Sequence, residues 1–398
     1  MNPQIRQLYD LALQPSRIII GLMSGTSLDG LDIACCRFID AGRATKYEIL
    51  NFITISYTES EQDAIRQVFA KADAPLEKVC LINALLGRLH GRMVNEILAT
   101  WGYKNTEIDL IASHGQTIFH LPDFSHDRKF PDSTLQVGDA DHIASICNII
   151  TLSDFRQKHV AAGGQGAPLS VYGDFLLLNK PGKRRYLINI GGISNFTFLP
   201  GINNAGIMAS DTGPGNTLSD ALIRKFLPGK RYDLNGKLAL SGQVIPELLK
   251  ILKDHPFFDA PFPKTTGPEM FSMFYFEQAV ILSEIDSPKL EDLLSTICQL
   301  VADSLFDALV FYGATDQAEY YMSGGGIYNQ AIIKKLGKKA IWLENINSTA
   351  LLGLPSDAKE AALFAVLANE AVAGDFSSLS AEFLGMPAVT FGKISLPR

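Results

Sequence analysis

Short apolar runs rich in β-branched residues alternate along this chain with longer segments of amphipathic character. The short runs are typical of strands and the longer ones of helices. The predicted strands are Arg17–Gly21, Leu31–Phe38, Tyr47–Ser56, Leu110–Ser113, Ile149–Thr151, Tyr186–Ile190, Asn195–Leu199 and Glu319–Ser323. The predicted helices are Glu61–Ala70, Pro75–Trp101, Ala140–Cys147, Pro214–Phe226, Val244–Lys253, Lys289–Phe311, Gln330–Leu336 and Ser356–Val372. Such alternation favours an α/β fold over a sandwich or a helical bundle.

One segment interrupts this pattern near the middle of the chain. Residues 179–185 read NKPGKRR, with a proline, a glycine and a cluster of basic side chains. We predict a domain boundary here, with an N-terminal domain over 1–181 and a C-terminal domain over 182–398. The last segment of the chain has the alternative of packing back on the first domain. The opening residues 1–17 lack the apolar stretch of a signal peptide and predict a short surface helix.

Two stretches share a strand, a turn rich in Gly, Ser, Thr and Asn, and a second strand. They are residues 17–38 and residues 186–199, one on each side of the predicted boundary. Glycine turns leave backbone N–H groups unobstructed, and such concavities bind phosphate oxygens. Two such turns facing each other would hold a nucleoside triphosphate, whereas the alternative is a pair of ordinary hairpins. The chain has no P-loop motif and no Rossmann glycine fingerprint, so a dehydrogenase is disfavoured.

Composition narrows the function classes. The 398 residues are 47% hydrophobic, which excludes a mainly disordered chain, and carry 35 basic against 42 acidic side chains for a net charge of -7. That balance disfavours nucleic-acid binding. Five cysteines without a C-x-x-C pair indicate neither a disulfide framework nor a zinc site. No apolar run looks long enough to span a membrane, and we expect a cytoplasmic protein.

Asp211 is the strongest candidate for a catalytic group. It follows an apolar stretch and precedes Thr212-Gly213-Pro214-Gly215-Asn216, so a carboxylate lies beside a glycine turn. There it is able to take a proton from water or a hydroxyl, although a helix N-cap is the simpler alternative. Glu360 lies early in a predicted helix, where a solvated helix face is the simpler reading.

Further polar groups follow predicted strands. His114 either orients a sugar hydroxyl or ties down its own loop, and the pattern does not separate the two. Asp154 and Arg156 look like a charged pair, and an arginine fork also suits a carboxylate substrate. Gly324-Gly325-Gly326 comes between a strand and a helix, where bare backbone admits a base or a phosphate, or simply makes a tight turn.

Taken together, these motifs resemble one family. In chain order they are Gly21-Leu-Met-Ser-Gly-Thr-Ser-Leu-Asp-Gly30, Ser113-His-Gly-Gln-Thr117, Asp154-Phe-Arg156, Gly163-Gly-Gln-Gly-Ala-Pro168, Asn189-Ile-Gly-Gly-Ile-Ser-Asn195, Asp211-Thr-Gly-Pro-Gly-Asn216 and Ser323-Gly-Gly-Gly326. Over residues 17–372 the sequence is similar to the anhydro-N-acetylmuramic acid kinases. That family belongs to the hexokinase, Hsp70 and actin superfamily, so the resemblance implies two α/β domains flanking an ATP cleft.

The resemblance also implies a reaction. Such a kinase opens the anhydro ring of 1,6-anhydro-N-acetylmuramic acid with water and phosphorylates O6 with ATP, a step of peptidoglycan recycling. Asp211 would be the general base, and Asp29 with bound water would contact Mg²⁺. The implied partners are the sugar and ATP, with no nucleic acid and no membrane, and a homodimer is left open.

The same resemblance assigns the remaining site residues. The implied ATP-binding residues are Ser24, Gly25, Thr26, Ser27, Leu28, Asp29, Gly30, Leu31, Gly191, Gly192, Gly324, Gly325 and Glu360. The implied sugar-binding residues are His114, Gln116, Asp154, Arg156 and Gly164.

The sequence departs from the family pattern at two places. Ser170-Val-Tyr-Gly-Asp174 replaces a Val-Pro-Ala-Phe-His stretch, and Gly267-Pro268-Glu269 replaces Gly-Arg-Glu. These changes leave another 1,6-anhydro sugar as an alternative substrate. A non-catalytic ATP-dependent sugar sensor is the alternative from a different class.

Overall fold

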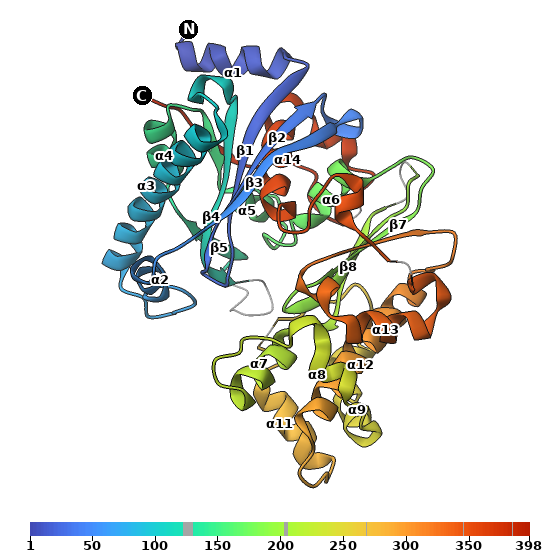
Figure 1. The fold of residues 1–398 in the computed structure, drawn as a ribbon. Coiled ribbons are helices and arrows are strands. Elements are labelled where there is room, and N and C mark those ends of the chain that lie inside the picture. Colours follow the sequence, from blue (N-terminus) through green and yellow to red (C-terminus); the bar gives the residue numbers. More distant parts are fainter. Residues whose placement is uncertain (122–129, 203–205, 268, 345, 384) are drawn as a thin grey trace. The chain divides into compact units, whose positions relative to one another are not determined.

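Two β-sheets organise the chain in the computed structural model, which describes residues 1–121, 130–202, 206–267, 269–344, 346–383 and 385–398. Each sheet belongs to its own structural unit (Figure 1). The first unit comprises Met1–Leu178 together with Gly353–Arg398, and the second comprises Asn179–Leu352. The first unit thus ends three residues before the predicted limit at 181, and residues 353–398 lie in the first unit instead of the second.

The first unit has a seven-stranded sheet with the order β12-β6-β4-β1-β2-β3, and β5 pairs with β4 beside this path. Its strands are β1 (Ser16–Ser24), β2 (Gly30–Ile39), β3 (Lys46–Ser56), β4 (Leu110–Leu121), β5 (Ser133–Val137), β6 (Thr151–Ser153) and β12 (Lys393–Ser395). Its helices are α1 (Pro3–Leu13), α2 (Glu59–Arg66), α3 (Leu76–Trp101), α4 (Ala140–Cys147), α5 (Phe155–Ala161), α6 (Ser170–Leu178) and α14 (Lys359–Ala373).

Strand β1 is buried on both faces, which explains its continuous apolar run. Ile20 and Leu22 pack into a core shared with α3, and α3 and α4 cover that face of the sheet (Figure 1). On the opposite face α14 approaches so closely that a Cβ on Gly21 would lie 1.9 Å from the carbonyl oxygen of Ala361. Glycine is therefore required at this crossing because the backbone of α14 occupies the space of a side chain.

The second unit has a five-stranded sheet with the order β11-β10-β7-β8-β9. Its strands are β7 (Arg185–Ile190), β8 (Ile193–Leu199), β9 (Met208–Pro214), β10 (Glu319–Ser323) and β11 (Asn347–Ser348). Its helices are α7 (Thr217–Phe226), α8 (Lys237–Ser241), α9 (Pro246–Lys253), α10 (Pro256–Asp259), α11 (Met273–Leu282), α12 (Leu290–Phe311) and α13 (Gln330–Lys339). Side chains from the sheet and from six of these helices form one core: α7, α8, α9, α11, α12 and α13.

Helix α12 contradicts the prediction that no apolar run is long enough to span a membrane. It is the one helix among the described residues that meets that test by length and composition. However, 78% of its apolar window is buried inside the structure. Leu294, Val301 and Leu305 belong to the core of the second unit. The apolar character of α12 is therefore that of a core helix.

The two sheets repeat one topology. In the first unit three antiparallel strands, β3-β2-β1, continue into the parallel strands β4 and β6. In the second unit β9-β8-β7 continue in the same way into β10 and β11. The predicted α/β class is confirmed, with one such sheet in each unit.

The crossing at Gly21 yields a stability prediction with a matched control. Gly21→Ala should lower the free energy of unfolding by about 1–3 kcal/mol, because its new methyl group collides with the backbone of α14. Gly25→Ala should change it by less than about 0.5 kcal/mol, since a Cβ there meets nothing closer than 3.8 Å. Urea denaturation of both variants measures the difference, and equal stabilities would contradict the close packing.

Candidate active site

The first Gly-rich turn, Gly25–Asp29, connects β1 to β2 and is held from below by buried side chains. The Ser24 hydroxyl lies 2.6 Å from Oε1 of Gln116 and 2.8 Å from the hydroxyl of Tyr57. Nε2 of Gln116 donates to the carbonyl oxygens of Gly25 and Thr117, at 3.1 Å each. Ser24 and Gln116 are both buried, so their side chains fix the turn rather than extend into open space.

Among the predicted ATP-binding residues of this turn, two groups are distinguished by exposure. Thr26, Ser27 and Asp29 are exposed, so their polar groups are available to a ligand. The side chains of Leu28 and Leu31 lie in the core of the first unit. Gly30 has no room for a Cβ, which would lie 2.4 Å from the carbonyl oxygen of Ile55. These last three residues are able to offer a ligand only their backbone.

Carboxylates gather beside this turn. Asp32, the second residue after Gly30, accepts a hydrogen bond from the Thr54 hydroxyl at 2.6 Å. Burial raises the pKa of Asp32, and the nearby charges of Glu360, Asp29 and Asp357 raise it further. Glu360 is exposed in the first turn of α14, in agreement with the simpler interpretation of a solvated helix face. Asp32 was not among the predicted site residues, although a charged residue inside an apolar strand is a visible signal.

His114 serves Arg156 and its own loop. Its Nδ1 lies 2.8 Å from the carbonyl oxygen of Gly115, and its Nε2 accepts a hydrogen bond from Nε of Arg156 at 2.8 Å. Burial and the Arg156 charge lower the pKa of His114. The ring is therefore neutral, with its proton on Nδ1. Both nitrogens are occupied, so the geometry favours loop anchoring over a direct contact with sugar.

The guanidinium group of Arg156 forms hydrogen bonds through two of its three nitrogens. Nη1 donates to the carbonyl oxygen of Gly166 at 2.9 Å, and Nε donates to His114. Burial lowers the pKa of Arg156 and the charge of Glu360 opposes that shift, so a carboxylate lies near this side chain. Nη2 has no hydrogen-bond partner among the described residues and is the group that a bound carboxylate would meet.

The expected ion pair between Asp154 and Arg156 is wrong. Asp154 adopts a left-handed backbone conformation with φ of 55° and instead lies 3.2 Å from Nζ of Lys393. Gly164 serves packing, because a Cβ there would lie 2.3 Å from the ring of His159. Neither contact shows a sugar-binding role.

The two departures from the family pattern have different outcomes. Residues 170–174 form the start of α6, and Val171, Tyr172, Gly173 and Asp174 are all buried. Asp174 pairs with Lys359 at 2.8 Å, beside the first turn of α14. This departure therefore alters packing against α14. Pro268, the second departure, lies outside the described residues.

In the second unit Asp211 lies within β9 and not at a helix start. Helix α7 begins at Thr217 with Asn216 as its N-cap residue, which removes the helix-cap alternative for Asp211 and shortens the helix predicted from Pro214. Oδ2 of Asp211 accepts a hydrogen bond from the backbone N–H of Thr266 at 2.8 Å. Its Oδ1 has no partner among the described residues. Burial raises the pKa of Asp211 to about 6, so near neutral pH it is a carboxylate able to accept a proton.

The loop that holds Asp211 is anchored by Lys264. The backbone N–H of Asp211 donates to the carbonyl oxygen of Lys264 at 2.9 Å. Nζ of Lys264 donates to the carbonyl oxygens of Phe257 and Phe258, at 2.9 Å each, and lies over the ring of Phe262. Lys264 and Thr266 thus position the carboxylate. The sequence showed no pattern linking residues 264–266 to Asp211.

The second Gly-rich turn, Gly191-Gly192, packs against the loop that follows β9. Its carbonyl oxygens accept hydrogen bonds from the backbone N–H groups of Asn216 and Gly215, at 2.8 Å each. A Cβ on Gly215 would lie 2.3 Å from the carbonyl oxygen of Gly191. Gly192 itself is exposed. The carbonyl groups of the turn are thus paired within the unit, whereas the N–H group of Gly192 has no backbone partner among the described residues.

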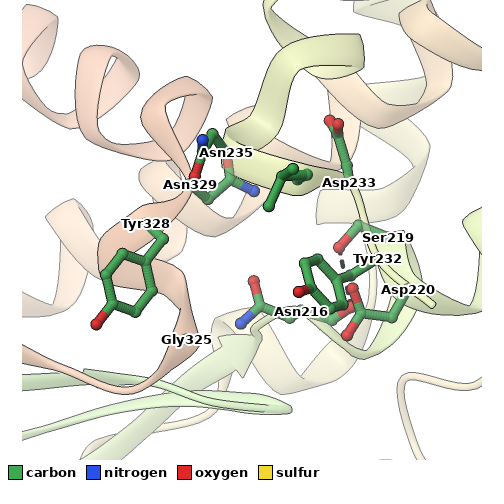
Figure 2. Close-up of a pocket in the computed structure, with 10 residues that line it drawn as sticks. Asn216, Ser219, Asp220, Tyr232, Asp233, Asn235, Gly325, Tyr328 and Asn329 are labelled. Carbon is green, nitrogen blue, oxygen red and sulfur yellow. Dashed lines mark hydrogen bonds between the residues drawn. The ribbon is translucent and has the colours of Figure 1, made fainter. Parts of the chain in front are cut away.

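A pocket of about 460 Å³ opens beside this turn within the second unit (Figure 2). It is lined by Asn216, Ser219, Asp220, Tyr232, Asp233, Leu234, Asn235, Gly325, Tyr328 and Asn329. Tyr232 and Tyr328 are 57% and 62% exposed, and their rings lie on opposite sides of the view. Gly325 is the predicted glycine that faces this space. Gly324, with φ of 80°, packs on Ile190 instead.

Asp220 is the carboxylate in this pocket that remains free. Asp233 accepts hydrogen bonds from the N–H groups of Leu238 and Ala239, and Asn329 caps α13. The Asp220 side chain has no hydrogen-bond partner among the described residues, and burial raises its pKa to about 6. Flat aromatic surface together with a free carboxylate suits a base and a sugar hydroxyl. The sequence prediction included Gly325 here but missed Asp220 and the two tyrosines.

These features define a class. The repeated sheet and a Gly-rich turn after the first strand of each sheet are those of an α/β protein built from two like units. Among solved structures, an activator of 2-hydroxyisocaproyl-CoA dehydratase from Clostridium difficile with bound ADPNP covers 88% of this chain and 94% of its own at 14% identity and a TM-score of 0.39. A ROK family glucokinase from Streptomyces griseus, in complex with glucose and AMPPNP, covers 89% of this chain and 99% of its own at 12% identity and a TM-score of 0.33.

Comparison of sequences places the chain within that class. The family model for anhydro-N-acetylmuramic acid kinase matches residues 17–392. An anhydro-N-acetylmuramic acid kinase of Pseudoalteromonas translucida is 44% identical over 99% of both chains. One of Caldanaerobacter subterraneus is 38% identical over 96% of this chain and 97% of its own. The chain belongs to the anhydro-N-acetylmuramic acid kinase family and is an ATP-dependent phosphotransferase, as the motifs predicted.

The buried carboxylate at Asp211 has a consequence for stability. The folded protein binds the Asp211 proton more tightly than the unfolded chain, so this group opposes folding increasingly as the pH rises from 3.8 to about 6. Asp211→Asn keeps an acceptor for the Thr266 N–H and removes the charge. Above this pH window the variant should be more stable by about 3 kcal/mol.

Urea denaturation at pH 4 and at pH 8 measures this difference. The gain should be much smaller at the lower pH, where Asp211 is neutral in the folded protein. A variant less stable than the parent at pH 8 would contradict the buried, uncompensated carboxylate.

Proposed function

We propose that this protein opens 1,6-anhydro-N-acetylmuramic acid with water and transfers the γ-phosphoryl group of ATP to O6, giving N-acetylmuramic acid 6-phosphate and ADP. Family membership supports the reaction. The observation that carries it is Asp211, whose Oδ1 is free and whose pKa is raised by burial to about 6. A pKa near the working pH is what a general base requires.

The bond changes balance around this carboxylate. Asp211 takes a proton from water while the water oxygen forms a bond to C1 of the sugar. The bond from C1 to O6 breaks, and its electron pair stays on O6. O6 then bonds to the γ-phosphorus as the bond to the β-phosphate oxygen breaks, and ADP leaves. The proton on Asp211 returns to solvent. The Thr266 N–H holds the other carboxylate oxygen and keeps Oδ1 aimed at its target.

Each end of ATP has a matching feature. We assign the phosphates to the turn Gly25–Asp29, whose backbone is fixed by Ser24 and Gln116 and whose outer groups are exposed. The adenosine end fits the pocket beside Gly325, with the base against Tyr232 or Tyr328 and a ribose hydroxyl donating to Asp220. These assignments rest on exposure, on free polar groups and on the absence of side chains at the glycines.

The acidic groups beside the first turn suit Mg²⁺. The described residues contain no group of three or more His, Cys, Asp or Glu side chains that could hold a metal ion by themselves. A magnesium ion bound mainly by triphosphate and water fits this arrangement, with Asp29 and Asp32 holding its waters. Bound there, the ion would neutralise charge on the phosphates. Burial and the charges of neighbouring carboxylates raise the pKa of Asp32, and the ion would reduce the contribution of those charges.

For the sugar, Arg156 is the best-supported recognition residue. Its free Nη2 would pair with the lactyl carboxylate of the substrate, while His114 and the Gly166 carbonyl hold the guanidinium plane. This pairing favours a substrate with a carboxylate over an anhydro sugar without one. We further propose a cytoplasmic enzyme, because ATP is its substrate, and leave a homodimer as a matter for measurement.

Asp211→Asn tests the base directly. Turnover should fall by about 10²-fold to 10⁴-fold, since the amide cannot accept the proton, while binding of sugar and nucleotide is retained. Product analysis in ¹⁸O-labelled water should place the label at C1 in the parent enzyme. Asp316→Asn, an exposed carboxylate of the same unit, is the control and should be neutral. Near-normal turnover in Asp211→Asn would move the base to Asp154 or Glu360.

Two glycine substitutions test the ATP assignments separately. Gly25→Val and Gly325→Val both place a side chain where a Cβ meets nothing closer than 3.7 Å, so both should fold. Each should raise the KM for ATP about tenfold or more by blocking the approach of the ligand. The KM for the sugar should change much less. Unchanged ATP kinetics in a folded variant would refute that assignment.

A further inference from the structure

A second pocket lies in the first unit, where helices α3 and α4 cross. Gly87 and Gly91 are one helical turn apart on α3 and allow the close approach. A Cβ on Gly87 would lie 2.4 Å from the carbonyl oxygen of Asp139, and a Cβ on Gly91 would lie 3.1 Å from Cβ of Ile146. Because the two helix backbones nearly touch, the residues that flank these glycines meet residues of α4 at the surface.

The pocket formed there has a volume of about 440 Å³ and is lined by Arg88, Arg92, Asp141, His142, Ser145, Ile146 and Arg398. The side chains of three arginines and one aspartate therefore line the pocket, on a chain whose net charge is -7. An imidazole and a hydroxyl add further hydrogen-bonding groups. None of these residues takes part in the proposed reaction.

The arginines lack the partners that would make them a structural ion-pair network. Arg88 and Arg92 are four residues apart on α3, where like charges destabilise a helix. In the part of the chain that the structure describes, no carboxylate lies within ion-pair distance of Arg88, Arg92 or Arg398. Asp141 lines the same pocket but forms no ion pair with them, so it reduces the local positive charge without neutralising it. A bound anion would relieve this repulsion.

We propose that this pocket binds a phosphate monoester, carried by a molecule of sugar-phosphate size. Arginine forks match phosphate oxygens in a bidentate manner. The Ser145 hydroxyl and the His142 ring supply further hydrogen bonds for the phosphate or for sugar hydroxyls. The volume exceeds the need of a free phosphate ion and lies in the range of small-molecule sites. This site does not depend on the proposed reaction and lies on residues separate from it.

The test compares two double variants of equal charge. Arg88→Gln/Arg92→Gln removes both guanidinium groups on α3. Arg6→Gln/Arg66→Gln removes two arginines of the same unit that do not line the pocket, and so controls for net charge. Isothermal titration calorimetry uses the full chain with a saturating non-hydrolysable ATP analogue and magnesium. The probes are N-acetylglucosamine 6-phosphate, N-acetylglucosamine, inorganic phosphate and AMP.

We expect the parent and the control variant to bind N-acetylglucosamine 6-phosphate, and the pocket variant to bind it about tenfold more weakly or worse. Uncharged N-acetylglucosamine should show no such difference. Turnover at saturating substrate should be alike in all three proteins. Affinity should fall as salt is raised.

The other arms identify the source of the phosphate group. Inorganic phosphate that binds as tightly as the sugar phosphate, with the same arginine dependence, would overturn the sugar-sized ligand. Tighter binding of AMP would replace the sugar phosphate by a nucleotide. Equal binding in the parent and the pocket variant, equal weakening in both variants, or no binding at millimolar concentration would overturn the site itself.

Discussion

The hydroxyl of Ser24 is the contact on which the first Gly-rich turn depends. It donates a hydrogen bond to Gln116 and therefore must accept one from Tyr57, whose own oxygen accepts a hydrogen bond from Nε2 of His90, 2.8 Å away. Burial lowers the pKa of His90 to about 4, so the ring is neutral and holds this one orientation. The direction of each hydrogen bond in this series from His90 to Gln116 is therefore fixed. Reversing any one of them would leave two donors or two acceptors facing each other. The turn is thus preorganised before any ligand arrives.

The residues of the proposed site that could be predicted from the sequence are those with a local signature, and their roles stay predictions. Gly25, Gly325 and Asp211 were predicted because bare backbone and a carboxylate beside it leave a local signature in the chain. The strands β1, β2, β7 and β10 were predicted within a few residues because β-branched runs mark buried strands. Even the return of residues 353–398 to the first unit had been an open alternative.

What could not be predicted depends on contacts between distant segments. Lys264 and Thr266 support Asp211 across more than fifty residues, and Tyr57 and His90 support Ser24 from two other elements. The ion pair expected between Asp154 and Arg156 failed for the same reason: His114 and Lys393, far away in sequence, are the true partners. The helix predicted from Pro214 was placed too early, because strand β9 continues through Asp211 to Pro214 and α7 begins at Thr217.

The two units use one sheet topology for opposite electrostatic tasks. In the first unit the groups behind the Gly-rich turn, Ser24, Gln116, Tyr57 and His90, are uncharged and hydrogen-bonded to one another, although Nδ1 of His90 has no partner among the described residues. In the second unit Asp211 is a half-buried carboxylate whose Oδ2 accepts one N–H group and whose Oδ1 has no partner among the described residues. A fully paired Asp211 would be a weaker base, because each added hydrogen bond would stabilise the carboxylate and lower its pKa. The fold therefore tolerates an unfavourable charge at the position where the proposed reaction requires a proton acceptor.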